Sequence, residues 1–187
     1  MGRWEPNARG RLQQAALELY SDGGFENTTV SQIAQRAGLT ERTFFRHFTD
    51  KREVLFWGAR ELQDLLVKAV ADAPDSVGPL DSVATALQAA SAVFQQREFS
   101  RQRQSIIAAN PELQERELIK LASLSAAIAD TLRRRGVPDP AASLTAEAGI
   151  AVFKIAFERW VDETNEQDFP RLIRESLDEL KAVIAGA

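Results

Sequence analysis

Apolar residues recur along this chain three or four positions apart, the spacing of an α-helix, over almost its whole length. The first clear stripe runs from Leu12 to Tyr20, and the last runs from Phe169 to Ile184. No stretch shows the strict alternation of apolar and polar residues that indicates a strand. The pattern therefore predicts an all-α protein of about nine helices.

We expect an N-terminal domain of residues 1–50 and a second domain of residues 51–187, linked by the helix predicted to follow Asp50. Within the second domain, Pro and Gly residues separate segments with helical spacing. The helices expected there cover residues 51–73, 80–97, 99–109, 111–135 and 141–163, followed by a last helix from Phe169 onward.

A short helix with a tight corner is predicted after Thr29. Thr29 and Gln32 have the spacing of a capping box, in which each side chain bonds the backbone N–H of the other residue. Ala34 and Gly38 supply small residues where two helices cross closely. Gly38 can also end the helix, because glycine takes a left-handed backbone conformation without steric cost.

A second short helix is predicted to follow this corner. Thr40 can cap it, and Phe44 and Phe48 lie one turn apart, so both face a core. Asp50 is predicted to cap a third, long helix that continues to about Ala73. Two short helices joined by a tight corner are typical of a helix-turn-helix.

The outward face of the second short helix carries groups that hydrogen-bond phosphates and base edges. An ordinary helical corner with a solvated basic face is the alternative at this point. The residues on this face are Arg42, Thr43, Phe45, Arg46 and His47.

The segment from Arg11 to Leu55 resembles the DNA-binding domain of the TetR family of bacterial transcriptional regulators. The matching pieces read AALELYSDGGFENTTVSQIA, AGLTERTFFRHF and DKREVL. The resemblance implies a three-helix DNA-binding domain followed by a helical ligand-binding and dimerisation domain. It also implies a regulator, which we expect to be a repressor released from a palindromic double-stranded DNA operator by a small molecule.

Carried over residue by residue, the resemblance assigns DNA contacts of two kinds. Many family members have Tyr where this chain has Phe45, so the expectation here is packing of the ring on a thymine methyl. The expected base-reading residues are Arg42, Thr43 and Phe45, the expected phosphate-contacting residues are Thr29, Thr40, His47 and Lys51, and Arg46 lies on the same face.

The net charge of −4 argues weakly against DNA binding, but the charges are unevenly distributed along the chain. Residues 1–60 hold nine Lys or Arg and seven Asp or Glu, a balance of +2, whereas the rest hold 14 and 20, a balance of −6. The positive end coincides with the predicted helix-turn-helix, although chance unevenness is the simpler alternative. An acidic remainder keeps a protein off nonspecific polyanions.

Several classes of chemistry are excluded. The chain has no cysteine and a single histidine, which removes thiol catalysis, disulfides and nearly all His-based catalytic sets. We therefore expect no enzyme, no metal site and no cofactor. No apolar run has the length of a membrane helix and the N-terminus does not read as a signal peptide, so we expect a cytoplasmic protein that does not enter a membrane. A helical carrier or sensor of an apolar molecule, without DNA binding, remains the alternative.

The ligand pocket is expected inside the second domain, as the family resemblance implies. The stretch RQRQSIIAANPELQERE resembles regulators that respond to acyl-coenzyme A esters, so the expected ligand is a small apolar molecule with an anionic end. Plain core packing is the alternative for each residue. The candidates are Trp57, Leu65, Phe94, Phe99, Arg103, Ile107, Leu121 and Phe157.

A homodimer is expected from the last two helices. The helix around residues 141–163 is apolar nearly all round, and a helix with two apolar faces must bury both. Left exposed, the spare face would form a patch that soluble monomers rarely tolerate. Pairing of the two helices with their symmetry mates, which is also the family's habit, gives a two-fold interface. The candidates are Val152, Ile155, Arg159, Leu172, Ile173, Leu177, Leu180 and Ile184.

Overall fold

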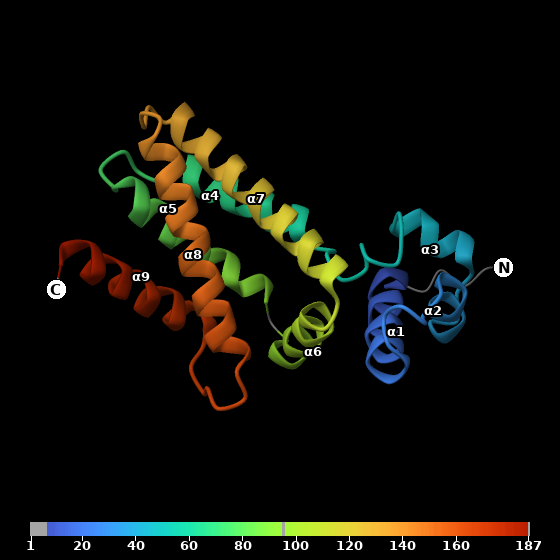
Figure 1. The fold of residues 1–187 in the computed structure, drawn as a ribbon. Helices are drawn as coiled ribbons and strands as arrows, with labels where there is room; N and C mark the ends of the chain where they lie inside the picture. The colour runs from blue at the N-terminus through green and yellow to red at the C-terminus, as the bar shows by residue number, and fades with distance from the viewer. Residues whose placement is uncertain (1–6, 95, 187) are drawn as a thin grey trace. The chain divides into compact units, whose positions relative to one another are not determined.

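The computed structural model describes residues 7–94 and 96–186 (Figure 1). These residues form nine α-helices, one short 3-10 helix and no strand, which confirms the predicted all-α class. The α-helices are α1 (Ala8–Gly23), α2 (Val30–Arg36), α3 (Glu41–His47), α4 (Ala59–Ala71), α5 (Pro79–Ala90), α6 (Arg97–Ala108), α7 (Pro111–Arg134), α8 (Ala141–Val161) and α9 (Phe169–Ala185), and the 3-10 helix η1 (Ser91–Val93) follows α5.

The chain forms two compact units. The first unit contains the described residues up to Trp57 together with Gln102–Glu117, and the second contains Gly58–Arg101 and the described residues from Leu118 onward. These units describe which segments pack together. The predicted domain boundary between residues 50 and 51 describes which segments fold independently, and it stays a prediction.

The corner between α6 and α7 packs within the first unit. Ile107 and Leu113 from this corner are fully buried. The Gln102 amide donates to Ser21 Oγ at the end of α1, 2.9 Å away, and Arg116 Nε donates to Glu53 Oε1 at 2.8 Å. The sequence pattern did not indicate that residues 102–117 pack with the first unit. The spacing of apolar residues along one helix carries no information on which distant segment that helix contacts.

The predicted long helix after Asp50 is wrong in its first part. Asp50 Oδ1 does accept from the backbone N–H groups of Arg52 and Glu53, but residues 51–58 form turns and α4 begins only at Ala59. The physical reason is that three consecutive side chains, Val54, Leu55 and Phe56, are all buried. A helix points consecutive side chains about 100° apart, so it could not bury all three against one surface.

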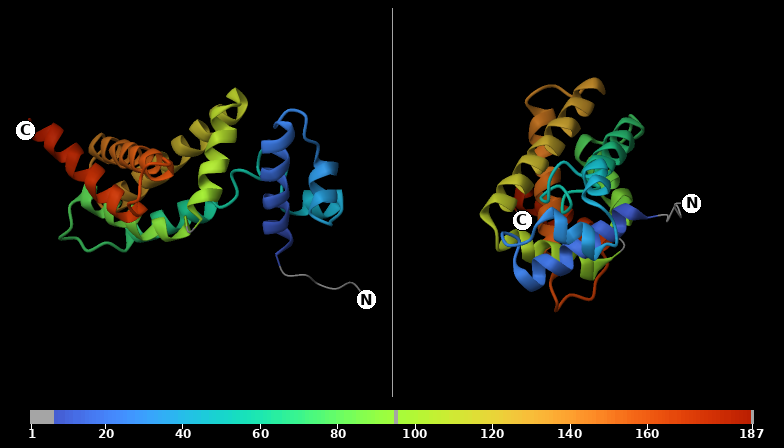
Figure 2. Two further views of the ribbon diagram at one scale, coloured as in Figure 1. Left: turned by 90° about the horizontal axis from the view of Figure 1, so that it is seen from below. Right: turned by 90° about the vertical axis from the view of Figure 1, so that its right-hand side faces the viewer.

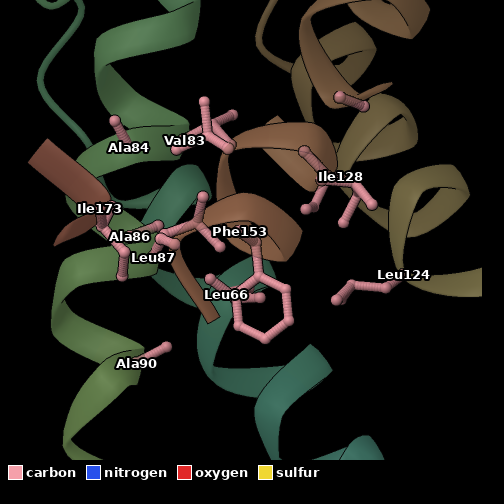
Figure 3. Packing of buried hydrophobic residues seen from close by; sticks show 14 of the residues in the cluster. Leu66, Val83, Ala84, Ala86, Leu87, Ala90, Leu124, Ile128, Phe153 and Ile173 are labelled. Carbon is pink, nitrogen blue, oxygen red and sulfur yellow. The ribbon is translucent and has the colours of Figure 1, made fainter. Parts of the chain in front are cut away.

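The second unit packs α5, α8 and α9 against one another around an apolar core, with α4 against α5 (Figure 2). Side chains of Leu66, Leu87, Ile128 and Phe153 come from four different helices and converge in this core (Figure 3). The sequence pattern of each helix predicted its apolar stripe, and the core joins these stripes.

Part of this core is an aromatic cluster. The rings that are in contact among Phe94, Phe153, Phe157, Trp160 and Phe169 have centroid separations between 5.0 and 6.4 Å. The helix predicted over residues 80–97 ends earlier, at Ala90, because η1 turns the chain and brings Phe94 into the cluster. Offset and edge-to-face ring pairs of this kind add to the stability that burial provides.

Helices α5 and α8 cross closely at Gly149. A Cβ added there would lie 2.5 Å from Val83 Cγ1, a distance that real side chains do not allow. Glycine therefore fills this position because of packing, even though it is a poor helix former.

Gly149→Ala is expected to lower the free energy of unfolding by about 1 kcal/mol, because overpacking costs about 1–3 kcal/mol and alanine returns about 1 kcal/mol of helix propensity. Gly23→Ala is the matched control, since no neighbouring atom lies within 4 Å of its added Cβ. Urea denaturation of both variants makes the comparison. A Gly149→Ala protein stabilised as much as Gly23→Ala would contradict the close crossing.

In the part of the chain that the structure describes, no helix is both long and apolar enough to cross a membrane.

Candidate nucleic-acid interface

Helix α2 begins at the predicted capping box. The Thr29 N–H donates to Gln32 Oε1 at 2.8 Å, and the Gln32 N–H donates to Thr29 Oγ1 at 3.2 Å. These two bonds satisfy backbone donors that the first turn of a helix leaves free. The start of α2 is therefore fixed by its own sequence.

The corner between α2 and α3 is closed by glycine and by a side chain from α1. Gly38 has a φ of +66°, in the left-handed region, and the Leu39 N–H donates to Ala34 O at 2.8 Å. The Arg11 guanidinium donates to the carbonyl oxygen of Ala37, at the C-terminal end of α2. A cation at this end also interacts favourably with the helix dipole, so α1 contributes to fixing the corner.

Helix α3 separates an inner from an outer face, as predicted. Thr40 Oγ1 caps it by accepting from the Thr43 N–H at 3.2 Å. Phe44 is completely buried, whereas the adjacent Phe45 is 55% exposed. Arg42 and Arg46 are exposed as well. The outer face thus presents two guanidinium groups and one ring, which suits contact with phosphates and base edges.

His47 lies half-buried at the end of α3. Burial, followed by the nearby charges of Arg46 and Arg9, holds the pKa of its imidazole below the ordinary value. In the free protein this favours the neutral ring over the imidazolium, whereas a nearby phosphate would favour the charged form.

Lys51, predicted to contact a phosphate, has its ammonium group engaged within the first unit. Its Nζ donates to the backbone carbonyl oxygens of Phe25, Glu26 and Thr28 at distances of 2.8, 3.1 and 3.1 Å. The structure of the free protein does not test the predicted phosphate contact, but it shows that the side chain already has a structural role.

Two family models match this chain, one in its N-terminal part and one in its C-terminal part. A family model described as "Bacterial regulatory proteins, tetR family" matches residues 12–56, and one described as "MftR C-terminal domain" matches residues 77–185, more than half of the chain. The chain belongs to the TetR family.

Relatives with assigned names are regulators of the same kind. The HTH-type transcriptional regulator TcmR of Streptomyces glaucescens is 37% identical over 81 residues, which are 43% of this chain and 36% of that protein. MftR of Mycobacterium tuberculosis, named as a mycofactocin biosynthesis transcriptional regulator, is 28% identical over 174 residues, which are 86% of this chain and 83% of that protein.

Solved structures share the fold along nearly the whole chain. The complex of SmeT with triclosan has a TM-score of 0.67 at 20% identity and covers 94% of this chain and 90% of that one. FadR of Thermus thermophilus, solved in complex with lauroyl-CoA, has a TM-score of 0.55 at 22% identity and covers 92% and 93%. At these identities the likeness concerns the fold.

This TetR-family protein is therefore a DNA-binding transcriptional regulator and not an enzyme. Repression, release by a ligand and dimerisation are typical of the family. The alternative of a helical carrier without DNA binding is set aside, because the matched N-terminal segment is the family's DNA-binding part.

The predicted ligand residues of this TetR-family protein are divided between the two compact units. Phe94 and Phe157 are in ring contact at 5.8 Å, whereas Leu65 is exposed and Ile107 is fully buried. The residues in the first unit are Trp57, Arg103 and Ile107, and those in the second are Leu65, Phe94, Phe99, Leu121 and Phe157.

Arg103 is committed to neighbours inside the first unit. Its Nε donates to Leu55 O at 2.6 Å, its Nη1 lies 3.1 Å from Glu117 Oε1, and its guanidinium stands 5.1 Å from the Phe56 ring centroid. An anionic ligand at Arg103 would have to compete with Glu117. The sequence missed this pairing, since no local pattern relates the two residues.

Two further arginines of α6, Arg97 and Arg101, are also engaged within the chain. Arg97 Nη2 donates to Asp162 O at 2.9 Å, and Arg101 Nε donates to Val161 O at 2.8 Å. Both groups lie at the C-terminal end of α8, where cations interact favourably with the helix dipole. Their role in the second unit is to hold the end of α8.

A hollow of about 290 Å³ opens in the second unit. It adjoins the aromatic cluster, and Phe94 is the one predicted ligand residue in its lining. The sequence pattern did not predict the other lining residues. The aromatic side chains of Trp160 and Phe169 were the one signal in the sequence that could have suggested them. The lining residues are Gln88, Ser91, Phe94, Trp160, Asp168, Phe169 and Pro170.

Half of the predicted dimer residues belong to the core of a single chain. Leu172, Ile173 and Leu177 of α9 pack onto α5 and α8 and are at most 7% exposed, which leaves them little surface to offer a partner. Ile155 and Ile184 remain 50% and 71% exposed, Leu180 is partly buried, and Arg159 pairs with Glu175 at 2.9 Å. The residues corrected to core positions are Val152, Leu172, Ile173 and Leu177.

Arg42→Ala is expected to relax sequence preference at one operator position, where bidentate readout of guanine is worth roughly 1–3 kcal/mol of discrimination. Arg46→Ala serves as the control, and a phosphate contact there predicts equal weakening on all duplexes. Competition binding on operators with single base changes measures both. Equal selectivity in the wild type and in Arg42→Ala would rule out base reading by Arg42.

Proposed function

We propose that this TetR-family regulator is a repressor that binds a palindromic operator as a homodimer and leaves it when a small apolar molecule binds. The observation that carries the DNA-binding part is the outer face of α3, where Arg42, Phe45 and Arg46 are exposed on a capped and tightly anchored helix. We propose that it acts in the cytoplasm, where its DNA operator would lie.

Each half-site is proposed to receive one α3 in the major groove. In this arrangement Arg42, Thr43 and Phe45 meet base edges, while Thr29, Thr40, Arg46 and His47 approach phosphates. A single helix of this length makes few contacts, and dimers overcome this by reading two half-sites about 34–36 Å apart.

The dimer is proposed to form through an exposed apolar stripe on α8. Leu144 and Ile155 are 69% and 50% exposed, and Ala148 and Ala151 lie between them at helical spacing on the same face. Small and apolar side chains in one stripe let two helices approach closely. Pairing of α8 and α9 with their symmetry mates would cover this stripe.

The ligand is proposed to be apolar, and acyl-coenzyme A esters are the first class to test. The proposal rests on the sequence stretch around α6, and the FadR protein of the same fold was solved with lauroyl-CoA. The engagement of Arg97, Arg101 and Arg103 within the chain favours the apolar body of such a ligand over its anionic end as the main determinant.

Selection of bound sequences from random duplexes tests the DNA-binding part. We expect a palindromic consensus whose affinity falls steeply with salt, because phosphate contacts release counterions. Lauroyl-CoA, lauric acid, triclosan and coenzyme A alone are then added to the complex. Release of DNA and a higher melting temperature with lauroyl-CoA, but not with coenzyme A, support the ligand proposal; no response to any apolar probe contradicts it.

A further inference from the structure

The ammonium group of Lys51 uses all of its hydrogen-bond donors within the protein. An ammonium has three N–H donors, and the Lys51 Nζ lies 2.8 Å from Phe25 O, 3.1 Å from Glu26 O and 3.1 Å from Thr28 O. A phosphate oxygen could bond Lys51 only by displacing one of these carbonyl groups from its ammonium.

Both ends of Lys51 are held in place. Its Nζ stands 4.4 Å from the centroid of the Phe25 ring, at cation–π distance. Its backbone carbonyl accepts from the Tyr20 hydroxyl at 2.6 Å. Tyr20 and Phe25 are in edge-to-face contact, so the lysine, the two rings and the carbonyl groups form one cluster.

The three carbonyl groups belong to the connection between α1 and α2. This connection ends at Thr29, the residue that caps α2. Three carbonyl oxygens that converge on one point repel one another and need a donor, because unpaired backbone carbonyls are costly away from water. Lys51 supplies a donor to each of them and so fixes the backbone immediately before the cap.

We infer that Lys51 is a positioning residue for operator binding: it holds the connection between α1 and α2 in the conformation that presents Thr29 and α2 to DNA, and it does not bond a phosphate itself. This inference rests on the DNA-binding function proposed above.

Lys51→Met tests the inference by removing the ammonium while keeping most of the stem. In the free protein, hydrogen exchange at the Gln32 and Ile33 N–H groups, the first bonds of α2, should become about tenfold faster. Operator affinity should fall by about tenfold or more. The slope of log affinity against log salt should stay unchanged, because no phosphate contact is lost.

Arg46→Met provides the matched control on the exposed face of α3. Loss of a direct phosphate contact reduces the salt slope by about 0.9 and leaves the free protein unaltered. We expect this behaviour of Arg46→Met, with no change in hydrogen exchange at Gln32. The two variants should therefore show opposite signatures.

Chemical restoration separates charge from hydrogen bonding within one variant. The chain has no cysteine, so Lys51→Cys creates a single alkylation site. Aminoethylation of that thiol restores an ammonium with three donors, whereas a trimethylammonioethyl group restores only the charge. The first should restore slow exchange at Gln32 and operator affinity, and the second should restore neither.

Two results would overturn the inference. One is a salt slope lowered by about 0.9 in Lys51→Met with unchanged hydrogen exchange, which would identify a phosphate contact. The other is recovery of affinity with the trimethylated group. The exchange measurement needs no DNA, so it tests anchoring by Lys51 separately from DNA binding. A wild-type protein that bound no operator would contradict the proposed function, and the exchange rates would still show whether Lys51 anchors the connection.

Discussion

Phe44→Ala is expected to destabilise the first unit by about 3–5 kcal/mol, the cost of removing a buried phenylalanine, and to abolish DNA binding. Phe44 is completely buried and its ring contacts those of Phe45 and Phe48 at 5.4 and 5.5 Å. No other side chain of α3 is buried, so the helix would lose its main attachment to the unit.

Phe45→Ala is the matched control, one position away on the same helix. Because Phe45 is 55% exposed, its removal should change stability by less than about 0.5 kcal/mol. It should nevertheless weaken operator binding, since its ring is proposed to pack on a thymine methyl. Thermal denaturation and operator titration of both variants separate the two effects. A stable Phe44→Ala protein that binds the operator would contradict the inner and outer faces assigned to α3.

Ile155→Asp is expected to convert the proposed homodimer into monomers and to lower specific operator affinity by about three orders of magnitude or more, the usual gap between specific and nonspecific binding. Ile155 lies in the exposed stripe of α8, where a carboxylate would be desolvated against its symmetry mate. A monomer presents only one α3, so it loses the paired half-sites.

Val93→Asp is the matched control, because Val93 is another exposed apolar residue of the second unit that lies outside the stripe. It should stay dimeric in sedimentation and bind the operator. Ile173→Asp would not serve as a test, since Ile173 is fully buried and its substitution would unfold the unit. A wild-type protein that sediments as a monomer at micromolar concentration would contradict the proposed dimer.

The sequence by itself determined the local elements of the DNA-binding region. The Thr29 and Gln32 capping box, the corner at Gly38 and the cap at Thr40 all appear in the structure as predicted. Each depends on residues within five positions of one another, whose geometry the backbone fixes, and Arg11 of α1 adds one distant contact to the corner. The inner position of Phe44 and the outer position of Phe45 follow from the same short-range periodicity.

Only the tertiary structure decided which surfaces remain free. The stripe of α9 through Leu172 and Ile173 looks the same in sequence whether it faces a partner or its own core, and here it is buried in the chain. Likewise, the charges of Lys51 and Arg103 look available until the fold brings carbonyl groups of Phe25 and Leu55 against them. Periodicity states that a face must be covered, but the identity of what covers it depends on contacts between residues far apart in the chain, which no local pattern contains.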